Sequence, residues 1–270
     1  MDRAIGVFDS GIGGLSVLKA LRAELPHQHF IYVADSGHAP YGERDQAHVL
    51  ARSRAIVQHL VGQNVKALVI ACNTATAAAI HLLRAEHPGL ALIGVEPALK
   101  PAVAISKTRR IGVMATRSTL ASARFQALLA LQAAHATFVL QPCDGLAHAI
   151  EQSAETGNTT ETIALCANYT SAIGHFGIEK GEIDTLVLGC THYPFARETL
   201  RALLGPGVQL VDNGEAVARQ TRRLVQTATD VPAGTAIDQV SLFTTGQPKA
   251  LQAAAQRWLG LSPPVNLLLF

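Results

Sequence analysis

The chain has 270 residues, with Lys+Arg 22 against Asp+Glu 20, a formal net charge of +2, and 49% hydrophobic against 16% charged residues. This composition is typical of compact globular proteins and excludes a disordered or coiled-coil chain. The sequence contains no basic run with interleaved aromatic residues, so nucleic acid is not an expected partner.

The first predicted elements alternate short apolar strands with longer amphipathic helices. Strands are predicted at AIGVFD, FIYVAD, ALVIAC and LALIGV, and helices over about 15–24, over about 46–62, and from residues 73–76 to near His87. Strands that alternate with helices indicate a parallel α/β sheet. The first unit is expected to close near Pro97.

The pattern restarts at Ile111, with a strand over 111–114 and a helix from about Thr119. IGVFDSGIGGL at Ile5 and IGVMATRSTL at Ile111 both begin with IGV and turn into a helix near a leucine, and LVIACNT and LVLGCTH agree at the next landmark. Internal similarity of this kind indicates duplication. We therefore predict an α/β protein of two pseudo-symmetric domains with mainly parallel sheets.

Two of the predicted strands end in a cysteine that polar residues follow. LVIACNTAT carries Cys72, and LVLGCTHYP carries Cys190. Ligands of parallel sheets bind outside the carboxyl ends of the strands, so two facing halves would present both thiols to one ligand in the cleft between them. A packing role is the alternative for a cysteine, but the matched placement favours function. Cys143 and Cys166 lack this setting and are assigned to packing.

Another polar cluster follows the first strand, where Asp9 and Ser10 precede GIGG at the head of a helix. Helix N–H groups favour an anion there, and Asp9 as a simple helix cap is the alternative. A nucleotide-binding module is a competing interpretation, but the third glycine of a dinucleotide loop and the Gly-Lys-Ser/Thr of a phosphate loop are absent. Comparable polar segments that suit a small substrate with carboxylate and ammonium groups follow other strands, at Pro40-Tyr41-Gly42, Asn73-Thr74, Thr116 and Thr191-His192.

The compartment is suggested by the apolar runs and the cysteines. The longest aliphatic runs span about eight to ten residues, short of the roughly 20 that cross a bilayer, and the first residues show no export signal. Four cysteines without a CxxC pair indicate reduced thiols and give no support to a metal site. We expect a soluble, cytoplasmic protein without a membrane partner.

The motifs DSGIGGLSV, PYG, ACNTATA and GCTHYP, in this order and spacing, resemble the glutamate racemase family, and VDNG at 211–214 is a further match. The resemblance covers nearly the whole chain and is weakest beyond about residue 240. It implies an isomerase that interconverts L-glutamate and D-glutamate for peptidoglycan synthesis, with glutamate as substrate and with no cofactor and no metal. It also implies a homodimer. The implied domains are 1–97 plus 208–270 and 98–207, with the active site in the interdomain cleft.

Two opposed thiols suit this reaction, because inversion at an α-carbon requires proton removal on one face and proton donation on the other. One sulfur must be a thiolate and the other a thiol. An ordinary thiol has a pKa of about 8.5, and it needs local help to act as a base near neutral pH. Helix N-termini and neighbouring polar groups can lower a thiol pKa. Pro97 with Pro101, and Gly205-Pro206-Gly207, are expected at the crossings between the domains.

By this resemblance, Cys72 takes the α-proton of D-glutamate with help from Asp9, and Cys190 takes that of L-glutamate with help from His192. For His192 a purely structural hydrogen bond stays the alternative, and Glu151 is a lesser candidate for tuning the second half of the site. The implied substrate-binding residues are Asp9, Ser10, Pro40, Tyr41, Gly42, Asn73, Thr74, Thr116, Thr119, Thr191 and His192. A related two-cysteine racemase acting on aspartate or another carboxylated substrate is the neighbouring hypothesis.

Overall fold

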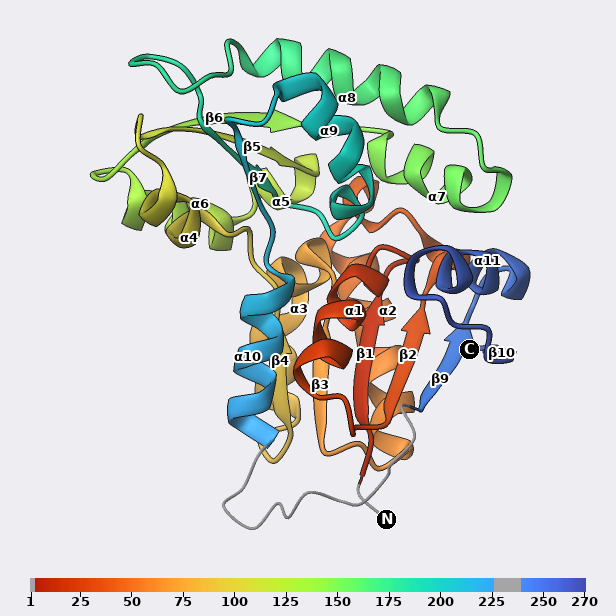
Figure 1. Cartoon of the computed structure of the whole chain (residues 1–270). Helices are drawn as coiled ribbons and strands as arrows, with labels where there is room; N and C mark the ends of the chain where they lie inside the picture. The colour runs from red at the N-terminus through yellow and green to blue at the C-terminus, as the bar shows by residue number, and fades with distance from the viewer. Residues whose placement is uncertain (1–2, 226–238) are drawn as a thin grey trace. The chain divides into compact units, whose positions relative to one another are not determined.

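A computed structural model describes residues 3–225 and 239–270. The chain forms two compact units, Met1–Val95 with Gly214–Phe270, and Glu96–Asn213 (Figure 1). Residues 1–2 and 226–238, which fall within the expected first domain, lie outside the described residues.

The first unit is built on a six-stranded parallel sheet in the order β10-β9-β2-β1-β3-β4. Its strands are β1 (Ile5–Asp9), β2 (Phe30–Ala34), β3 (Ala67–Ile70), β4 (Ala91–Gly94), β9 (Val240–Thr244) and β10 (Val265–Leu267). Its helices are α1 (Leu15–Glu24), α2 (Gln46–Gly62), α3 (Asn73–Glu86), α10 (Gly214–Val225) and α11 (Pro248–Leu259), with short 3-10 turns η1 (Ser36–His38) and η2 (Tyr41–Glu43).

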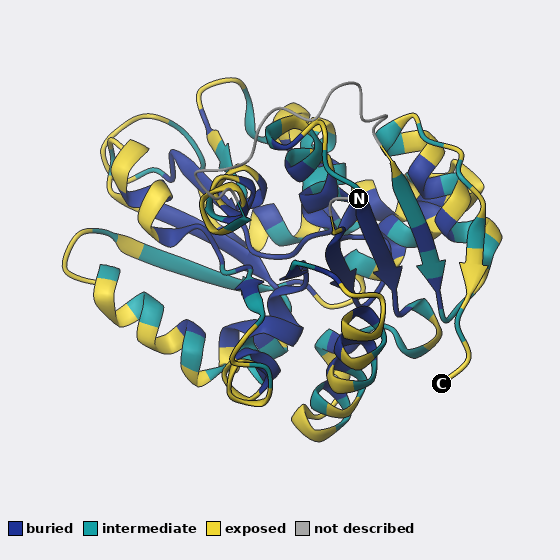
Figure 2. Ribbon diagram, turned by 90° about the horizontal axis from the view of Figure 1, so that it is seen from below, coloured by how far each residue is buried: buried dark blue, intermediate teal, exposed yellow. Residues whose placement is uncertain are grey.

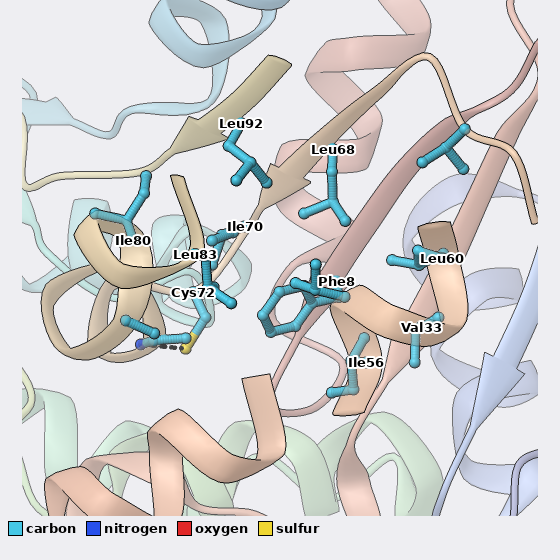
Figure 3. Packing of buried hydrophobic residues seen from close by; sticks show 14 of the residues in the cluster. Phe8, Val33, Ile56, Leu60, Leu68, Ile70, Cys72, Ile80, Leu83 and Leu92 are labelled. Carbon is cyan, nitrogen blue, oxygen red and sulfur yellow. Dashed lines mark hydrogen bonds between the residues drawn. The ribbon is translucent and has the colours of Figure 1, made fainter. Parts of the chain in front are cut away.

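Helices cover both faces of this sheet, and for that reason β1, β2 and β3 are buried along their whole length. On one face, Phe8 of β1 packs with Ile56 of α2 and Leu83 of α3, in a buried cluster that also contains Cys72 (Figure 3). On the other side α1 packs against α10 and α11. The central strands are buried, and the helices expose their outer sides (Figure 2).

The second unit contains a four-stranded parallel sheet in the order β6-β5-β7-β8. Its strands are β5 (Arg110–Ala115), β6 (Thr137–Pro142), β7 (Thr185–Leu188) and β8 (Gln209–Val211). Its helices are α4 (Leu99–Ile105), α5 (Arg117–Ala121), α6 (Ala123–Gln132), α7 (Leu146–Thr156), α8 (Thr160–Ile173) and α9 (Arg197–Leu204), with a 3-10 turn η3 (Tyr193–Ala196). Ile111 and Val113 of β5 pack with Leu99 and Phe125 in its core.

The two sheets share one strand order, because β2-β1-β3-β4 in the first matches β6-β5-β7-β8 in the second. The predicted α/β fold with mainly parallel sheets in two similar halves is therefore confirmed. The first unit adds β9 and β10 beyond β2, and these strands come from the part of the chain after residue 239.

Two expectations about the connections are wrong. Gly205-Pro206-Gly207 is not a crossing, because β8 follows it and pairs with β7 inside the second unit. The chain therefore returns to the first unit after Asn213. Pro101 is not at a crossing either, because it lies inside α4. A smaller difference concerns the helix expected from about Thr119, which begins at Arg117 because the Thr116 side chain caps it.

Candidate active site

Cys72 and Cys190 occupy matching positions at the carboxyl edges of the two sheets. The backbone N–H of Ala71, just before Cys72, donates to the carbonyl of Phe8 in β1 at 2.7 Å. The residue just before Cys190 donates in the same way to the carbonyl of Met114 in β5, also at 2.7 Å. The duplicated fold thus delivers one thiol at the end of β3 and one at the end of β7.

Cys72 is buried, with 5% of its surface exposed, at the start of α3. Its sulfur accepts the backbone N–H of Ala75 at 3.4 Å, which the dashed line in Figure 3 marks. It also lies 3.7 Å from the Ser10 hydroxyl. The thiol is therefore fixed between the first turn of a helix and the polar end of β1.

Asp9 is fully buried at the end of β1, and its carboxylate binds the turn that leads into α1. One carboxylate oxygen accepts the N–H of Ser10 at 2.8 Å, and the other accepts the N–H of Gly14 at 2.6 Å. A phosphate at this helix N-terminus would have to displace the protein's own carboxylate. The geometry therefore argues against a nucleotide-binding loop.

The pKa of Cys72 lies well above that of an ordinary thiol, chiefly because burial disfavours the thiolate and because the negative Asp9 carboxylate is near. The hydrogen bonds that Cys72 makes with the Ala75 N–H and the Ser10 hydroxyl act in the opposite direction and are outweighed. The start of α3 therefore does act to lower the pKa of Cys72, through the Ala75 N–H, but burial and the Asp9 charge outweigh it. The side chain is a protonated thiol at neutral pH.

The Pro40-Tyr41-Gly42 segment follows β2 on the same sheet edge. Tyr41 is 1% exposed and belongs to the buried cluster that contains Cys72, whereas Pro40 and Gly42 are half-buried. The Tyr41 hydroxyl donates to the Asp35 carboxylate at 2.5 Å. Two more expected substrate residues, Asn73 and Thr74, are buried in the first turn of α3, directly after Cys72.

In the second unit, Cys190, His192 and Glu151 form a chain of contacts. The Cys190 sulfur lies 3.6 Å from Nδ1 of His192, and Nε2 of the same ring lies 2.8 Å from a carboxylate oxygen of Glu151. His192 and Cys190 are buried, and Glu151 reaches the ring from α7. Glu151, a lesser candidate from sequence, is thus the direct partner of the histidine.

Burial by itself would lower the pKa of His192, but the contacts of the ring reverse the direction of the shift. The hydrogen bonds to Cys190 and Glu151 and the charges of those two groups raise the pKa of His192 well above its ordinary value. The ring is therefore an imidazolium at neutral pH. The protonated ring places an N–H group beside the Cys190 sulfur.

The expected threonines of the second unit also lie at this edge of its sheet. Thr116 follows β5 and caps α5, where its hydroxyl accepts the N–H of Thr119 at 3.3 Å and donates to the Thr119 hydroxyl at 2.9 Å. Thr191 is buried directly after Cys190. Each unit therefore places small polar side chains beside its cysteine.

Sequence reasoning missed the partners of Tyr41. Asp35 stands at the end of β2 and binds Arg52 of α2 through two hydrogen bonds of 3.0 and 2.9 Å. An aspartate at the carboxyl end of a strand was a visible signal, since it repeats the placement of Asp9. Arg52 gave no signal, because one arginine among several in an amphipathic helix does not reveal its partner.

The described residues, 3–225 and 239–270, show neither a membrane-spanning helix nor a metal-binding cluster. No helix in these ranges is long and apolar enough to cross a membrane. Within the same residues, no group of three or more His, Cys, Asp or Glu side chains is placed to hold a metal ion. All four cysteines are free and buried.

The chain is similar to known racemases in sequence. Residues 14–221 match the model of the Asp/Glu/Hydantoin racemase family. A glutamate racemase from Ectopseudomonas mendocina is 48% identical over 221 residues, which cover 82% of this chain and 81% of that protein. One from Herpetosiphon aurantiacus is 44% identical over 247 residues, which cover 92% of this chain and 94% of that protein.

Solved structures of glutamate racemases resemble the fold. RacE1 from Bacillus anthracis superposes with a TM-score of 0.85 at 30% identity, covering 99% of this chain and 98% of that one. The Escherichia coli glutamate racemase, solved in complex with L-glutamate and the activator UDP-MurNAc-ala, gives a TM-score of 0.84 at 30% identity, with 100% of both chains covered.

Proposed function

The chain belongs to the Asp/Glu/hydantoin racemase family, and from this premise we propose that it interconverts L-glutamate and D-glutamate by proton transfer between two cysteines. One observation carries the proposal: Cys72 and Cys190 stand at equivalent positions of a duplicated fold but have opposite electrostatic neighbours. One sulfur is held as a thiol, and the other lies beside an imidazolium.

The two neighbourhoods supply the acid and the base that racemisation needs. The Cys190 sulfur, paired with the His192 imidazolium, removes the α-proton of L-glutamate, so that the C–H bond breaks and an S–H bond forms. The Cys72 thiol delivers its proton to the opposite face of the same carbon, so that its S–H bond breaks and the new C–H bond forms. The product is D-glutamate, and the reverse reaction starts from Cys72 as thiolate and Cys190 as thiol.

Asp9 and Glu151 set the starting state of this relay. The Asp9 carboxylate disfavours negative charge on Cys72 and keeps that sulfur protonated. Glu151 holds the His192 ring in the charged form and orients it toward Cys190. Both acidic residues are thus proposed to act on the cysteines, Asp9 by its charge and Glu151 through His192.

The substrate would be held by polar groups at the two sheet edges. We propose these residues for binding: Asp9, Ser10, Pro40, Tyr41, Gly42, Asn73 and Thr74 in the first unit, and Thr116, Thr119, Thr191 and His192 in the second. Fixed hydroxyls and backbone N–H groups stabilise negative charge that develops on the substrate, because they need no reorganisation during the reaction. The two units are proposed to be the two domains of the enzyme.

Glutamate is preferred over aspartate as the proposed substrate, because the curated relatives at 44–48% identity over most of the chain are glutamate racemases. D-glutamate formed in this way is proposed to serve peptidoglycan synthesis. The enzyme is further proposed to be a homodimer of the cytoplasm, where reducing conditions would keep its four free thiols reduced.

Isotope transfer tests the proposed reaction. Purified protein incubated with L-glutamate in D₂O, without added cofactor, is expected to yield D-glutamate with deuterium at the α-carbon, while the remaining L-glutamate initially keeps its hydrogen. Chiral chromatography with mass spectrometry measures both, and L-aspartate under the same conditions tests the alternative substrate. D-glutamate that retains its original α-hydrogen would contradict two separate bases.

Cysteine variants assign the two bases. Cys72→Ala and Cys190→Ala are each expected to abolish turnover, whereas Cys166→Ala, which changes a buried cysteine of α8, should leave it measurable. Wild-type turnover in Cys72→Ala or Cys190→Ala would remove that residue from the relay.

A further inference from the structure

Asp35 is a fully buried carboxylate with an unusual number of donors. Tyr41 donates its hydroxyl at 2.5 Å and Thr245 donates its hydroxyl at 2.7 Å, while the His38 ring lies at 3.1 Å. Arg52 adds two N–H groups at 3.0 and 2.9 Å. A buried charge of this kind is stable only when it is paired and hydrogen-bonded, so the donors depend on one another.

The Arg52 guanidinium is the counter-charge in this cluster, and it is largely buried, with 13% of its side chain exposed. Its Nε and Nη2 bind the Asp35 carboxylate, and its Nη1 donates to the backbone oxygen of Phe270 at 3.1 Å. The Phe270 ring lies against the guanidinium, 5.3 Å from centroid to Cζ. Arg52 therefore joins the end of β2 to a segment that is distant in sequence.

The charged state of the pair follows from its contacts. Burial would raise the pKa of Asp35, but the hydrogen bonds from Arg52, Tyr41 and Thr245 lower it below its ordinary value. The hydrogen bond to Asp35 raises the pKa of Arg52. Asp35 and Arg52 thus stay an ion pair throughout the neutral range.

The pair is connected to both parts of the proposed substrate site in the first unit. The backbone N–H of Asp35 donates to the carbonyl of Asp9 at 2.9 Å, and the Asp35 side chain holds the Tyr41 hydroxyl. The chain from residue 36 to residue 45 has only two short 3-10 turns, so few backbone hydrogen bonds fix its course. Its conformation therefore depends on side-chain contacts, among them the buried contact between Tyr41 and Asp35.

Resting on the function proposed above, we propose that Arg52 is a positioning residue of the racemase, which orients Pro40-Tyr41-Gly42 for substrate binding through Asp35. Arg52 touches neither sulfur in this scheme. It acts by holding the carboxylate that holds Tyr41, and a small displacement of a binding segment costs on the order of 100-fold in catalysis.

Arg52→Gln tests the proposal, and Arg54→Gln is its matched control on the same helix. Arg54 also binds a carboxylate, Glu86, but at the surface, where side-chain exposures are 49% and 35%. We expect the KM for both glutamate enantiomers to rise by about 10- to 100-fold in Arg52→Gln, with kcat within about threefold of wild type. Arg54→Gln is expected to keep the wild-type KM.

Hydrogen exchange supplies a readout that does not depend on activity. Backbone amides of residues 36–45 should exchange faster in Arg52→Gln than in wild type or Arg54→Gln, whereas a general loss of stability would accelerate exchange across the first unit. A wild-type KM in Arg52→Gln, or a raised KM with unchanged exchange over 36–45, overturns the proposal. If Arg52→Gln does not fold, Arg52→Lys replaces it as the test variant. Lysine keeps the positive charge but loses the two-pronged guanidinium geometry, and KM and hydrogen exchange are measured as before.

A double variant separates the role of Arg52 from direct substrate contact by Tyr41. Tyr41→Phe removes only the hydroxyl that donates a hydrogen bond to Asp35. If both residues act along one chain of contacts, the KM of the double variant with Arg52→Gln is expected to match that of the more severe single variant. Effects that multiply would overturn the proposal. A wild-type protein without racemase activity would instead contradict the proposed function. The hydrogen-exchange comparison would then still test whether Arg52 fixes residues 36–45.

Discussion

At the scale of single residues, the two duplicated halves differ at two positions near their cysteines. The strand that carries Asp9 in the first unit carries Ala115 at the corresponding point of the second. Two residues after the cysteine, the first unit has Thr74 and the second has His192. A carboxylate lies near one sulfur and an imidazolium near the other, and a relay of one acid and one base requires such unlike surroundings.

The His192–Glu151 contact predicts a specific dependence of stability on pH. The folded pKa of His192 is raised above its unfolded value of about 6.5. Stabilisation by the protonated ring is therefore fully present below about pH 6.5 and is lost as the pH rises through the folded pKa. Glu151→Gln should lower the free energy of unfolding by about 2 kcal/mol at pH 6, and by progressively less toward pH 9.

Urea unfolding of wild type and Glu151→Gln at a series of pH values measures this difference. Glu86→Gln, which removes the partner of exposed Arg54, is the control and should change stability little at any pH. A Glu151→Gln deficit that stays constant from pH 6 to pH 9, or grows, would show that His192 is not held in its charged form.

At the scale of elements, the sequence predicted most boundaries because hydrophobic periodicity and capping residues are local signals. The helices over Leu15–Glu24 and Gln46–Gly62 were predicted with these bounds. The Asp35–Thr245 contact joins residues 210 positions apart, and no local pattern encodes such a pair. The pKa of Cys72 could not be predicted for a related reason, since the helix N-terminus is visible in sequence and the degree of burial is not.

The β1–α1 turn shows how closely an element can constrain the site. A Cβ added to Gly14 would lie 2.7 Å from Cβ of Asp9 and 2.9 Å from the Tyr32 hydroxyl. The same glycine gives its N–H to the Asp9 carboxylate. Gly14→Ala should therefore displace Asp9, lower the free energy of unfolding by about 1–3 kcal/mol and reduce kcat/KM for both enantiomers equally, because enantiomers have equal free energies.

Gly62→Ala is the matched control for this prediction. Gly62 lies at the end of α2, and a Cβ there would meet nothing within 4 Å. Alanine in a helix is favoured over glycine by roughly 1 kcal/mol, so this variant should be as stable as wild type or more stable. Thermal unfolding and steady-state kinetics compare the two variants, and a Gly14→Ala enzyme with wild-type kcat/KM would contradict the steric argument.

At the scale of the whole molecule, the fold is a duplication in which only one unit is continuous along the chain. The first unit is closed by residues after Gly214, which add α10, β9, α11 and β10. The second unit runs without interruption from Glu96 to Asn213. The sequence indicated the duplication through its repeated motifs, but β8 was placed with the wrong unit because its pairing with β7 is not a local feature.

Continuity predicts that residues 96–213 fold when they are produced alone. The two ends of this unit are joined, because the Asn213 side chain donates to the carbonyl of Glu96 at 3.0 Å. A buried Asp184 carboxylate also fixes the loop before β5, accepting the Ser106 hydroxyl and the Lys107 N–H, each at 2.6 Å. Units of this size with their own core and adjacent termini are commonly autonomous domains.

The isolated unit should therefore unfold cooperatively on heating and show dispersed amide NMR signals. It retains Cys190, His192 and Glu151 but lacks Cys72, so it should have no racemase activity, while the His192 ring should still titrate above its ordinary pKa because both groups that raise that pKa are present. A control fragment ending at residue 207 would lack β8 and Asn213 and should be less stable. An ordinary His192 titration in a folded 96–213 fragment would mean that the charged ring depends on the first unit.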